Sequence, residues 1–202
     1  MSALKFYDNV LTDKECDRLI ELFESSDEKQ VGSIGNQYGS TKDTNVKSSI
    51  QIDCNFNVDN EINSIVLPKL RTALRMYRND FPSINHIEDW TITGGYTFQK
   101  FETENDGFKG WHTERTSTFP FCYRMLVWSL YLNDAAGTEF MHYDIVPAKK
   151  GRCAIWPSSW EYLHRSEQNR GLKYIMSGWC SYVLDPDLLQ ELYHLYENLS
   201  YR

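Results

Sequence analysis

The amino-acid sequence predicts an α+β domain that is mainly β. Helical patterns fall within the first 80 or so residues, whereas residues 90–183 consist largely of short apolar runs separated by turn residues. A group of helices followed by a group of strands is typical of an α+β fold, since a parallel α/β sheet would alternate the two. A chain of 202 residues can bury a sizeable core, and we expect residues 1–202 to form a single domain.

The N-terminal region begins with a predicted strand and a predicted helix. The strand covers residues 5–10, and Thr12 and Glu15 then form a capping box that starts a helix reaching about residue 25. Residues 28–48 are polar and rich in Gly, Ser, Asn and Thr. We expect them to form a long loop, which is a candidate lid over a functional site.

A second strand and a second helix follow this loop. Residues 49–54 alternate between apolar and polar side chains and so indicate the strand. The helix begins after Asp59 or Asn60 and ends near residue 79. Pro68 lies inside it and is expected to kink or divide it, because proline lacks a backbone N–H and clashes with the preceding turn.

The remaining strands form the predicted core at residues 90–183, which the helical region at 1–89 supports. A turn-rich segment at 102–111 interrupts the strands. The chain closes with a predicted amphipathic helix at 185–200, started by Asp185-Pro186. The predicted strands of the core cover residues 90–101, 123–132, 138–146, 152–156, 160–166 and 172–183.

Composition and charge narrow the class of protein. There are 21 basic and 28 acidic residues, so the net charge of −7 argues against general binding to nucleic acid phosphates. The five cysteines are scattered and form no Cys-x-x-Cys, which is typical of reduced thiols in a cytoplasmic protein. No apolar run resembles a signal peptide or a membrane span, so we expect a cytoplasmic protein without a membrane partner.

One group of residues indicates a metal site. His112 and Glu114 form a His-x-Glu pair, and His164 follows 52 residues after His112. In an extended segment, residues i and i+2 point to the same side, so this pair can bind one ion from one strand end. Two imidazoles and one carboxylate can cap one face of an octahedron and leave three positions free, as in non-haem iron(II) oxygenases.

A second pair competes with this interpretation. His142 and Asp144 form a His-x-Asp, but they lie only 22 residues before His164. The alternative reading of this pair is a solvent-facing strand edge. We therefore expect His112, Glu114 and His164 to be the metal ligands.

The segments around these residues carry a family resemblance. The types and the order of these segments resemble those of the 2-oxoglutarate- and iron(II)-dependent oxygenases, and specifically the prolyl-4-hydroxylase-like branch. The resemblance covers residues 90–183. That family's fold is a double-stranded β-helix, or jelly roll, which would here be flanked by the N-terminal helices and the C-terminal helix. The segments that carry the resemblance, besides His112-Thr-Glu114 and His164, are Tyr123–Asn133, Gly137–Phe140, Pro147–Arg152, Ala154–Pro157 and Lys173–Trp179.

The resemblance implies a reaction, its cofactors and the roles of further residues. The reaction would be hydroxylation of an unactivated C–H bond, in a prolyl or other peptidyl side chain, by O2 with release of succinate and CO2. Iron(II) and 2-oxoglutarate would be required, with ascorbate as an accessory reductant. Lys173, Tyr131 and Trp179 would contact 2-oxoglutarate. For Lys173 the physical need is independent of the family, because a buried carboxylate requires a compensating charge.

Two positions depart from the family pattern. Glu114 stands where aspartate is usual, and its extra methylene changes how far the carboxylate reaches. Phe101 stands near a position where many relatives have a tyrosine that contacts the cosubstrate, so Gln99 or Tyr96 is a candidate substitute. Arg124 and Trp156 are candidate site residues whose orientation the sequence does not fix.

Two other functions remain open at this point. A nucleobase-directed oxygenase of the DNA-dealkylation branch would carry Arg-x5-Arg after the distal histidine, whereas Arg165 and Arg170 are spaced one residue short. A non-catalytic jelly-roll binding module would require a degenerate metal site. The substrate itself, a peptide, protein or small molecule, and the oligomeric state leave no signature in the sequence.

Overall fold

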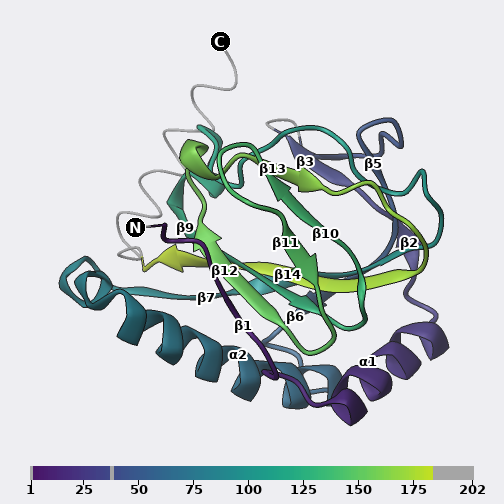
Figure 1. Cartoon of the computed structure of the whole chain (residues 1–202), viewed down its shortest axis with the longest axis horizontal. Coiled ribbons are helices and arrows are strands. Elements are labelled where there is room, and N and C mark those ends of the chain that lie inside the picture. The colour runs from purple at the N-terminus through teal and green to yellow at the C-terminus, as the bar shows by residue number, and fades with distance from the viewer. Residues whose placement is uncertain (1, 37–38, 184–202) are drawn as a thin grey trace.

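A seven-stranded antiparallel sheet organises the protein, whose computed structural model describes residues 2–36 and 39–183 (Figure 1). The strand order is β1-β12-β9-β14-β7-β6-β2, so segments distant in the sequence are neighbours in space. The bounds are β1 (Lys5–Tyr7), β2 (Gln30–Val31), β6 (Ile50–Asn55), β7 (Trp90–Phe101), β9 (Arg124–Tyr131), β12 (Cys153–Pro157) and β14 (Lys173–Tyr182).

Three smaller sheets complete the β structure. The first has the order β11-β10-β13 and covers part of one face of the seven-stranded sheet (Figure 1). The two remaining sheets are the pairs β3–β4 and β5–β8. The bounds are β3 (Ile34–Asn36), β4 (Gly39–Thr41), β5 (Lys47–Ser48), β8 (Gly107–Phe108), β10 (Ala135–Phe140), β11 (Val146–Ala148) and β13 (His164–Ser166).

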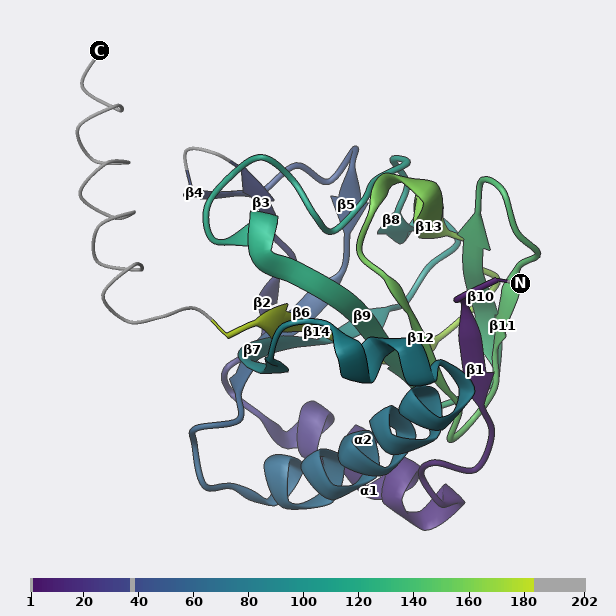
Figure 2. The ribbon, with the colours of Figure 1, turned by 90° about the vertical axis from the view of Figure 1, so that its left-hand side faces the viewer.

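Two helices, α1 (Asp13–Ser25) and α2 (Glu61–Asp80), cover the opposite face of the seven-stranded sheet (Figure 2). The capping box at Thr12 and Glu15 is present and starts α1 as expected. Three short 3-10 helices lie in the connections, η1 (Pro82–His86), η2 (Phe121–Tyr123) and η3 (Trp160–Tyr162). The mainly β architecture with flanking N-terminal helices is therefore confirmed.

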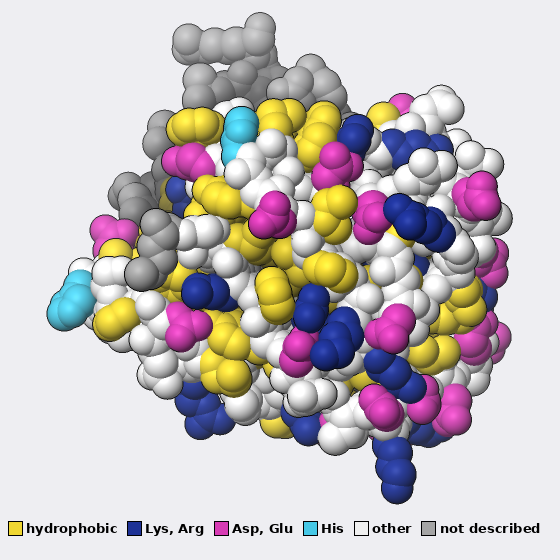
Figure 3. Space-filling model, in the orientation of Figure 1, with side chains coloured by type: hydrophobic (Ala, Val, Ile, Leu, Met, Phe, Trp, Pro, Cys, Tyr) yellow, Lys and Arg dark blue, Asp and Glu magenta, His cyan; other side chains and the backbone are white. Residues whose placement is uncertain are grey.

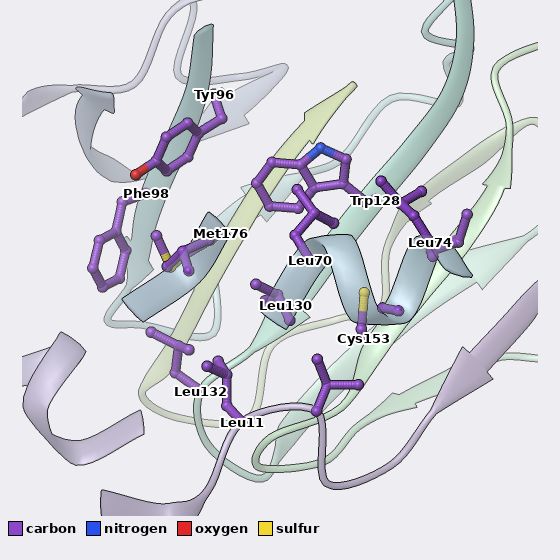
Figure 4. Close-up of a cluster of buried hydrophobic side chains, with 14 of the residues drawn as sticks. Leu11, Leu70, Leu74, Tyr96, Phe98, Trp128, Leu130, Leu132, Cys153 and Met176 are labelled. Carbon is purple, nitrogen blue, oxygen red and sulfur yellow. The ribbon is translucent and has the colours of Figure 1, made fainter. Parts of the chain in front are cut away.

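The seven-stranded sheet separates two hydrophobic clusters. The larger cluster fills the space between the sheet and the helices (Figure 4). Its members include Leu70 of α2, Trp128 and Leu130 of β9, and Met176 of β14. The smaller cluster lies on the other face and includes Val127, Tyr131, Ile175, Phe140 and Trp156. Because side chains alternate along a strand, β9 and β14 each supply residues to both clusters. The face that carries the smaller cluster is not covered by the helices.

Several element boundaries differ from the sequence-based expectation. Residues 28–48 are not one long loop, because β2 to β5 form short pairings there. Pro68 does not divide the second helix: α2 runs through it, held by an apolar face that is buried on both sides of the proline. Residues 138–146 are split between β10 and β11, and residues 160–166 between η3 and β13. The helix expected at 185–200 lies outside the described residues.

Two further observations concern the cysteines and the helices. All five cysteines are free. Among the helices that the structure describes, none combines the length and apolar character needed to cross a membrane.

The close approach of β14 to β9 gives a test of the packing. A Cβ added to Gly178 would lie 2.4 and 2.7 Å from ring carbons of the fully buried Trp128. We expect Gly178→Ala to lower the free energy of unfolding by about 2 kcal/mol, because the core has no room for the methyl group. Gly95→Ala is the matched control, since a Cβ there meets no atom within 4 Å. Urea unfolding of both variants measures the effect, and equal stability would contradict this packing.

Candidate metal and cosubstrate site

A cavity of about 440 Å³ lies on the face of the large sheet that the helices leave free. Its floor consists of inward-facing side chains from β6, β7, β9 and β14, including Thr97, Gln99, Ser129 and Ser177. Residues of β10, β13 and the segment after β8 close it from the other side. The volume falls in the range of small-molecule binding sites, and the lining is unusually polar for a protein interior.

Backbone hydrogen bonds bring the two histidines of the candidate metal site together. His112 and His164 form an isolated antiparallel bridge, with N–H to O distances of 3.0 Å in both directions. Their ring centroids are 4.3 Å apart. Glu114 follows two residues after His112, so its side chain returns to the same side. This bridge joins two residues that are 52 positions apart in the sequence.

The same backbone fixes the tautomer of both imidazoles. His112 Nδ1 lies 3.0 Å from the carbonyl of Gly110, and His164 Nδ1 lies 2.9 Å from the carbonyl of Tyr162. A carbonyl oxygen can only accept, so each Nδ1 carries the proton. Each Nε2 is therefore left with its lone pair for a metal ion.

Both Nε2 atoms lie close to the same oxygen of Glu114. Glu114 Oε1 lies 3.6 Å from His112 Nε2 and 3.7 Å from His164 Nε2. The ligand atoms of the three residues all lie within 4.8 Å of one another. In the part of the chain that the structure describes, this is the group of His, Cys, Asp and Glu side chains that could hold an ion. Two nitrogens and one carboxylate oxygen fit iron(II).

The protonation states also suit a metal ion. Burial alone would raise the pKa of the Glu114 carboxyl, but the two neighbouring imidazoles lower it well below its ordinary value. Burial lowers the pKa of His164. At neutral pH the carboxylate is ionised and His164 is neutral, which are the forms that bind metal.

The second oxygen of Glu114 is held by two other side chains. Glu114 Oε2 accepts hydrogen bonds from Arg124 Nη1 at 3.0 Å and from Trp179 Nε1 at 2.9 Å. The guanidinium carbon of Arg124 lies 3.6 Å from the centroid of the Trp179 ring, so the two donors also stack. The sequence predicts Trp179 beside the cosubstrate; Trp179 does line the cavity, and its indole N–H donates to the candidate metal ligand Glu114.

Lys173 lines another part of the cavity, and its Nζ lies 5.8 Å from the ring centroid of the fully buried Tyr131. Lys173 is only 3% exposed, and its Nζ donates to the carbonyl of Gly137 at 2.9 Å. Burial lowers the pKa of Lys173 to about 8. The Tyr131 hydroxyl lies 2.7 Å from Thr138 Oγ1. Lys173 forms no ion pair within the described residues, so a carboxylate bound here would satisfy both a buried charge and two hydroxyls.

Of the other site residues that the sequence suggests, four line the cavity and Tyr96 does not. Gln99, Phe101, Arg124 and Trp156 line the cavity. Tyr96 lies in the other cluster, where its hydroxyl donates to Asn63. Thus Gln99, and not Tyr96, is in place to contribute a polar group beside Phe101.

The competing metal pair is separated from the cavity. His142 and Asp144 are exposed in the bend between β10 and β11. Of the two arginines of the nucleobase alternative, Arg165 lines the cavity but is paired with Glu139, and Arg170 is paired with Glu167. The face shown in Figure 3 has basic and acidic side chains interspersed, with no continuous basic surface.

Several cavity residues escaped sequence reasoning, among them Lys47, Gln51 and Thr138. Thr138 lies within a segment that carries the resemblance, but nothing in its spacing pointed to Tyr131. Lys47 lies inside the polar segment 28–48, which the sequence predicts to be a loop, and Gln51 lies shortly after it. No periodicity distinguishes either residue from a surface residue.

Comparisons with known proteins agree at the level of the fold. No protein-family model and no curated protein matches the chain. A prolyl-4-hydroxylase from Pseudomonas putida aligns with a TM-score of 0.67 at 15% identity, over 91% of this chain and 95% of that one. A viral collagen prolyl hydroxylase from Paramecium bursaria Chlorella virus-1, solved as a 2-oxoglutarate complex, gives 0.63 at 16% identity, over 90% and 97% of the chains.

The chain has the prolyl-4-hydroxylase-like fold. A third structure extends the comparison to a peptide complex: the prolyl hydroxylase of Trichoplax adhaerens, solved with a peptide of a hypoxia-inducible factor, has a TM-score of 0.65 at 11% identity. The match covers 90% of this chain and 84% of that one. The predicted jelly roll is therefore confirmed.

The hydrogen bond from Trp179 to Glu114 can be tested by a substitution that removes the indole N–H. Trp179→Phe keeps an aromatic ring under Arg124 but deletes the N–H that Glu114 accepts. We expect iron(II) affinity to fall about 10-fold or more, because partners that orient a ligand contribute on that scale. Trp160→Phe is the control, since Trp160 is 68% exposed. Anaerobic iron(II) titration gives the two dissociation constants, and unchanged affinity in Trp179→Phe would exclude this role.

Proposed function

We propose that the protein is an iron(II)- and 2-oxoglutarate-dependent dioxygenase that hydroxylates an unactivated C–H bond. The observation that carries the proposal is the convergence of His112, Glu114 and His164 in a cavity whose far part holds the buried Lys173. The prolyl-4-hydroxylase-like fold supports it independently of these residues.

The residues divide into two sets by their chemistry. His112, Glu114 and His164 would hold iron(II), and Lys173 with Tyr131 and Thr138 would bind the distal carboxylate of 2-oxoglutarate. O2 would be the oxidant, which bound iron and 2-oxoglutarate would activate; one oxygen atom would go to the substrate and the other to succinate, with release of CO2. The protein itself positions the groups and excludes water, since the facing sheets bury His164, Lys173 and Tyr131.

A prolyl or other peptidyl side chain is the substrate we propose. The Trichoplax protein of the same fold was solved with a peptide. Ser33, Ile34 and the exposed Thr116 line the cavity together with the triad, and we infer that a substrate enters at this edge. A side chain entering there would approach the ligand set directly.

The first experiment is an anaerobic titration of the metal-free protein with iron(II) and 2-oxoglutarate. A visible metal-to-ligand charge-transfer band would report the chelate, because it requires both partners in one coordination sphere. We expect the band in the wild type and its loss in His164→Ala, which removes one of three ligands.

His142→Ala provides the control for this titration. His142 belongs to the competing pair and is exposed, so its substitution should leave the band unchanged. Loss of the band in His142→Ala with retention in His164→Ala would contradict the ligand assignment. Iron binding without any band in the wild type would favour a binding module with a degenerate site.

Lys173→Met tests the cosubstrate end separately. We expect the 2-oxoglutarate concentration needed for half-maximal band intensity to rise by about 10-fold or more, since a buried charge pair is lost. Iron(II) affinity should change little. In the wild type the requirement should also rise as pH rises above about 8, where Lys173 loses its proton.

Lys149→Met is the control for Lys173, because the Lys149 side chain is 52% exposed and pairs with Asp8. A fall in iron affinity in Lys173→Met, with an unchanged 2-oxoglutarate requirement, would show that the assigned role is wrong.

A further inference from the structure

A second buried lysine lines the cavity and forms no ion pair with any described residue. Lys47, in β5, is 6% exposed. Its Nζ donates to the carbonyl of Ser33 at 3.1 Å and to Gln51 Oε1 at 2.8 Å, which leaves one of its three donors unused. Both acceptors are neutral, and Lys47 forms no ion pair within the described ranges 2–36 and 39–183.

The neighbouring carboxylates compensate this charge only in part, because neither forms an ion pair with Lys47. Gln51 connects Lys47 to Asp53, because Gln51 Nε2 donates to Asp53 Oδ1 at 2.6 Å. Asp53 is exposed and also accepts from Gln30 at 2.7 Å, so solvent screens it. Glu114 has one oxygen toward the histidines and the other bound by Arg124 and Trp179. A buried ammonium without a counter-ion is costly, and an anionic ligand would offset that cost.

Lys47 is separated from the subsite of Lys173. Gln51, which holds Lys47, pairs with Gln99 of β7, and Gln99 pairs with Ile175 of β14. Two inter-strand spacings, or about 10 Å, therefore lie between Gln51 and the strand that carries Lys173. 2-Oxoglutarate has two carboxylates, one for the metal and one for Lys173. Neither is left for Lys47.

We propose that Lys47 binds a carboxylate of the primary substrate, so that the protein acts on substrates with a negative charge near the oxidised carbon. The inference rests on the proposed function, because that function assigns the Lys173 subsite to the cosubstrate. The electrostatics agree with it: burial lowers the pKa of Lys47 to about 8, and the charges of Glu114 and Asp53 oppose this shift. Lys47 is therefore largely protonated at pH 7, and it lines the same cavity as the triad.

The carboxylate has two possible sources, and paired probes separate them. N-acetyl-L-proline and N-acetyl-L-prolinamide differ only in a terminal carboxylate. The amides of N-acetyl-Pro-Glu and N-acetyl-Pro-Gln differ only in a side-chain carboxylate. Binding is measured by anaerobic calorimetry on protein saturated with iron(II) and 2-oxoglutarate, so that the Lys173 subsite is already filled and no turnover is needed.

We expect the wild type to bind the carboxylate member of one pair about 10-fold or more tightly than its amide. Lys47→Met should abolish this preference and Lys47→Arg should retain part of it. Lys42→Met, a change at an exposed lysine in the same segment, should leave it intact. The pair that shows the preference identifies the source of the carboxylate.

Three outcomes would overturn the inference. The wild type binds both members of each pair equally, or Lys47→Met keeps the preference, or Lys47→Met raises the 2-oxoglutarate requirement of the charge-transfer band. These outcomes leave the proposed function standing, provided that the wild type forms the band. A wild type without the band would instead contradict the proposed function, and the substrate role of Lys47 with it.

Lys47→Met should keep the thermal stability of the wild type, because an apolar side chain of similar volume replaces an unpaired buried charge. If Lys47 served only to hold Ser33 and Gln51, the variant would lose stability and keep the carboxylate preference. If Lys47→Met does not fold, Lys47→Gln, which keeps a donor for Ser33 and Gln51 but no charge, is measured in its place.

Discussion

Strand β14 is the element on which both the core and the site depend. It pairs with β9 on one side and β7 on the other, and both of its faces are covered. Its period of two sends Tyr174, Met176 and Cys180 into the core under the helices. The intervening positions, Lys173, Ile175, Ser177 and Trp179, line the cavity. A shift by one residue would place a lysine in the core and exchange every contact, so the core fixes the register of the site.

The second constraint is the charge balance inside the cavity. The chain has a net charge of −7, yet the cavity lining contains Lys47, Lys173, Arg124 and Arg165 against Glu114 and the exposed Asp53. Arg124 pairs with Glu114 and Arg165 with Glu139, whereas the buried Lys47 and Lys173 form no ion pair within the described residues. A site of this kind favours anionic ligands over neutral ones. The overall charge, which argues against nucleic acid binding, therefore gives no information about what the interior binds.

The parts of the fold that were predictable from the sequence depend on local spacing. The two faces of β9 and β14, the capping box at Thr12 and the His-x-Glu pair follow from the period of two or from a fixed offset. The short strands β2 to β5 did not, because segments of two or three residues have no period and form only through distant partners. Lys47 escaped notice for the same reason: its burial depends on β5 pairing with β8, some 60 residues later.

The position of Glu114 shows how a local departure from the family pattern is accommodated by contacts distant in sequence. Aspartate would be shorter by one methylene, so the glutamate carboxylate extends past the two imidazoles toward β9 and β14. There Arg124 and Trp179 hold its second oxygen, while the first remains between the Nε2 atoms of the histidines. The longer side chain loses more rotamer freedom when it is fixed. The two hydrogen bonds from the stacked side chains of Arg124 and Trp179 restrain the glutamate carboxylate. The shorter side chain of an aspartate would need less restraint. The carboxylate at position 114 and the donors at 124 and 179 therefore act as one unit.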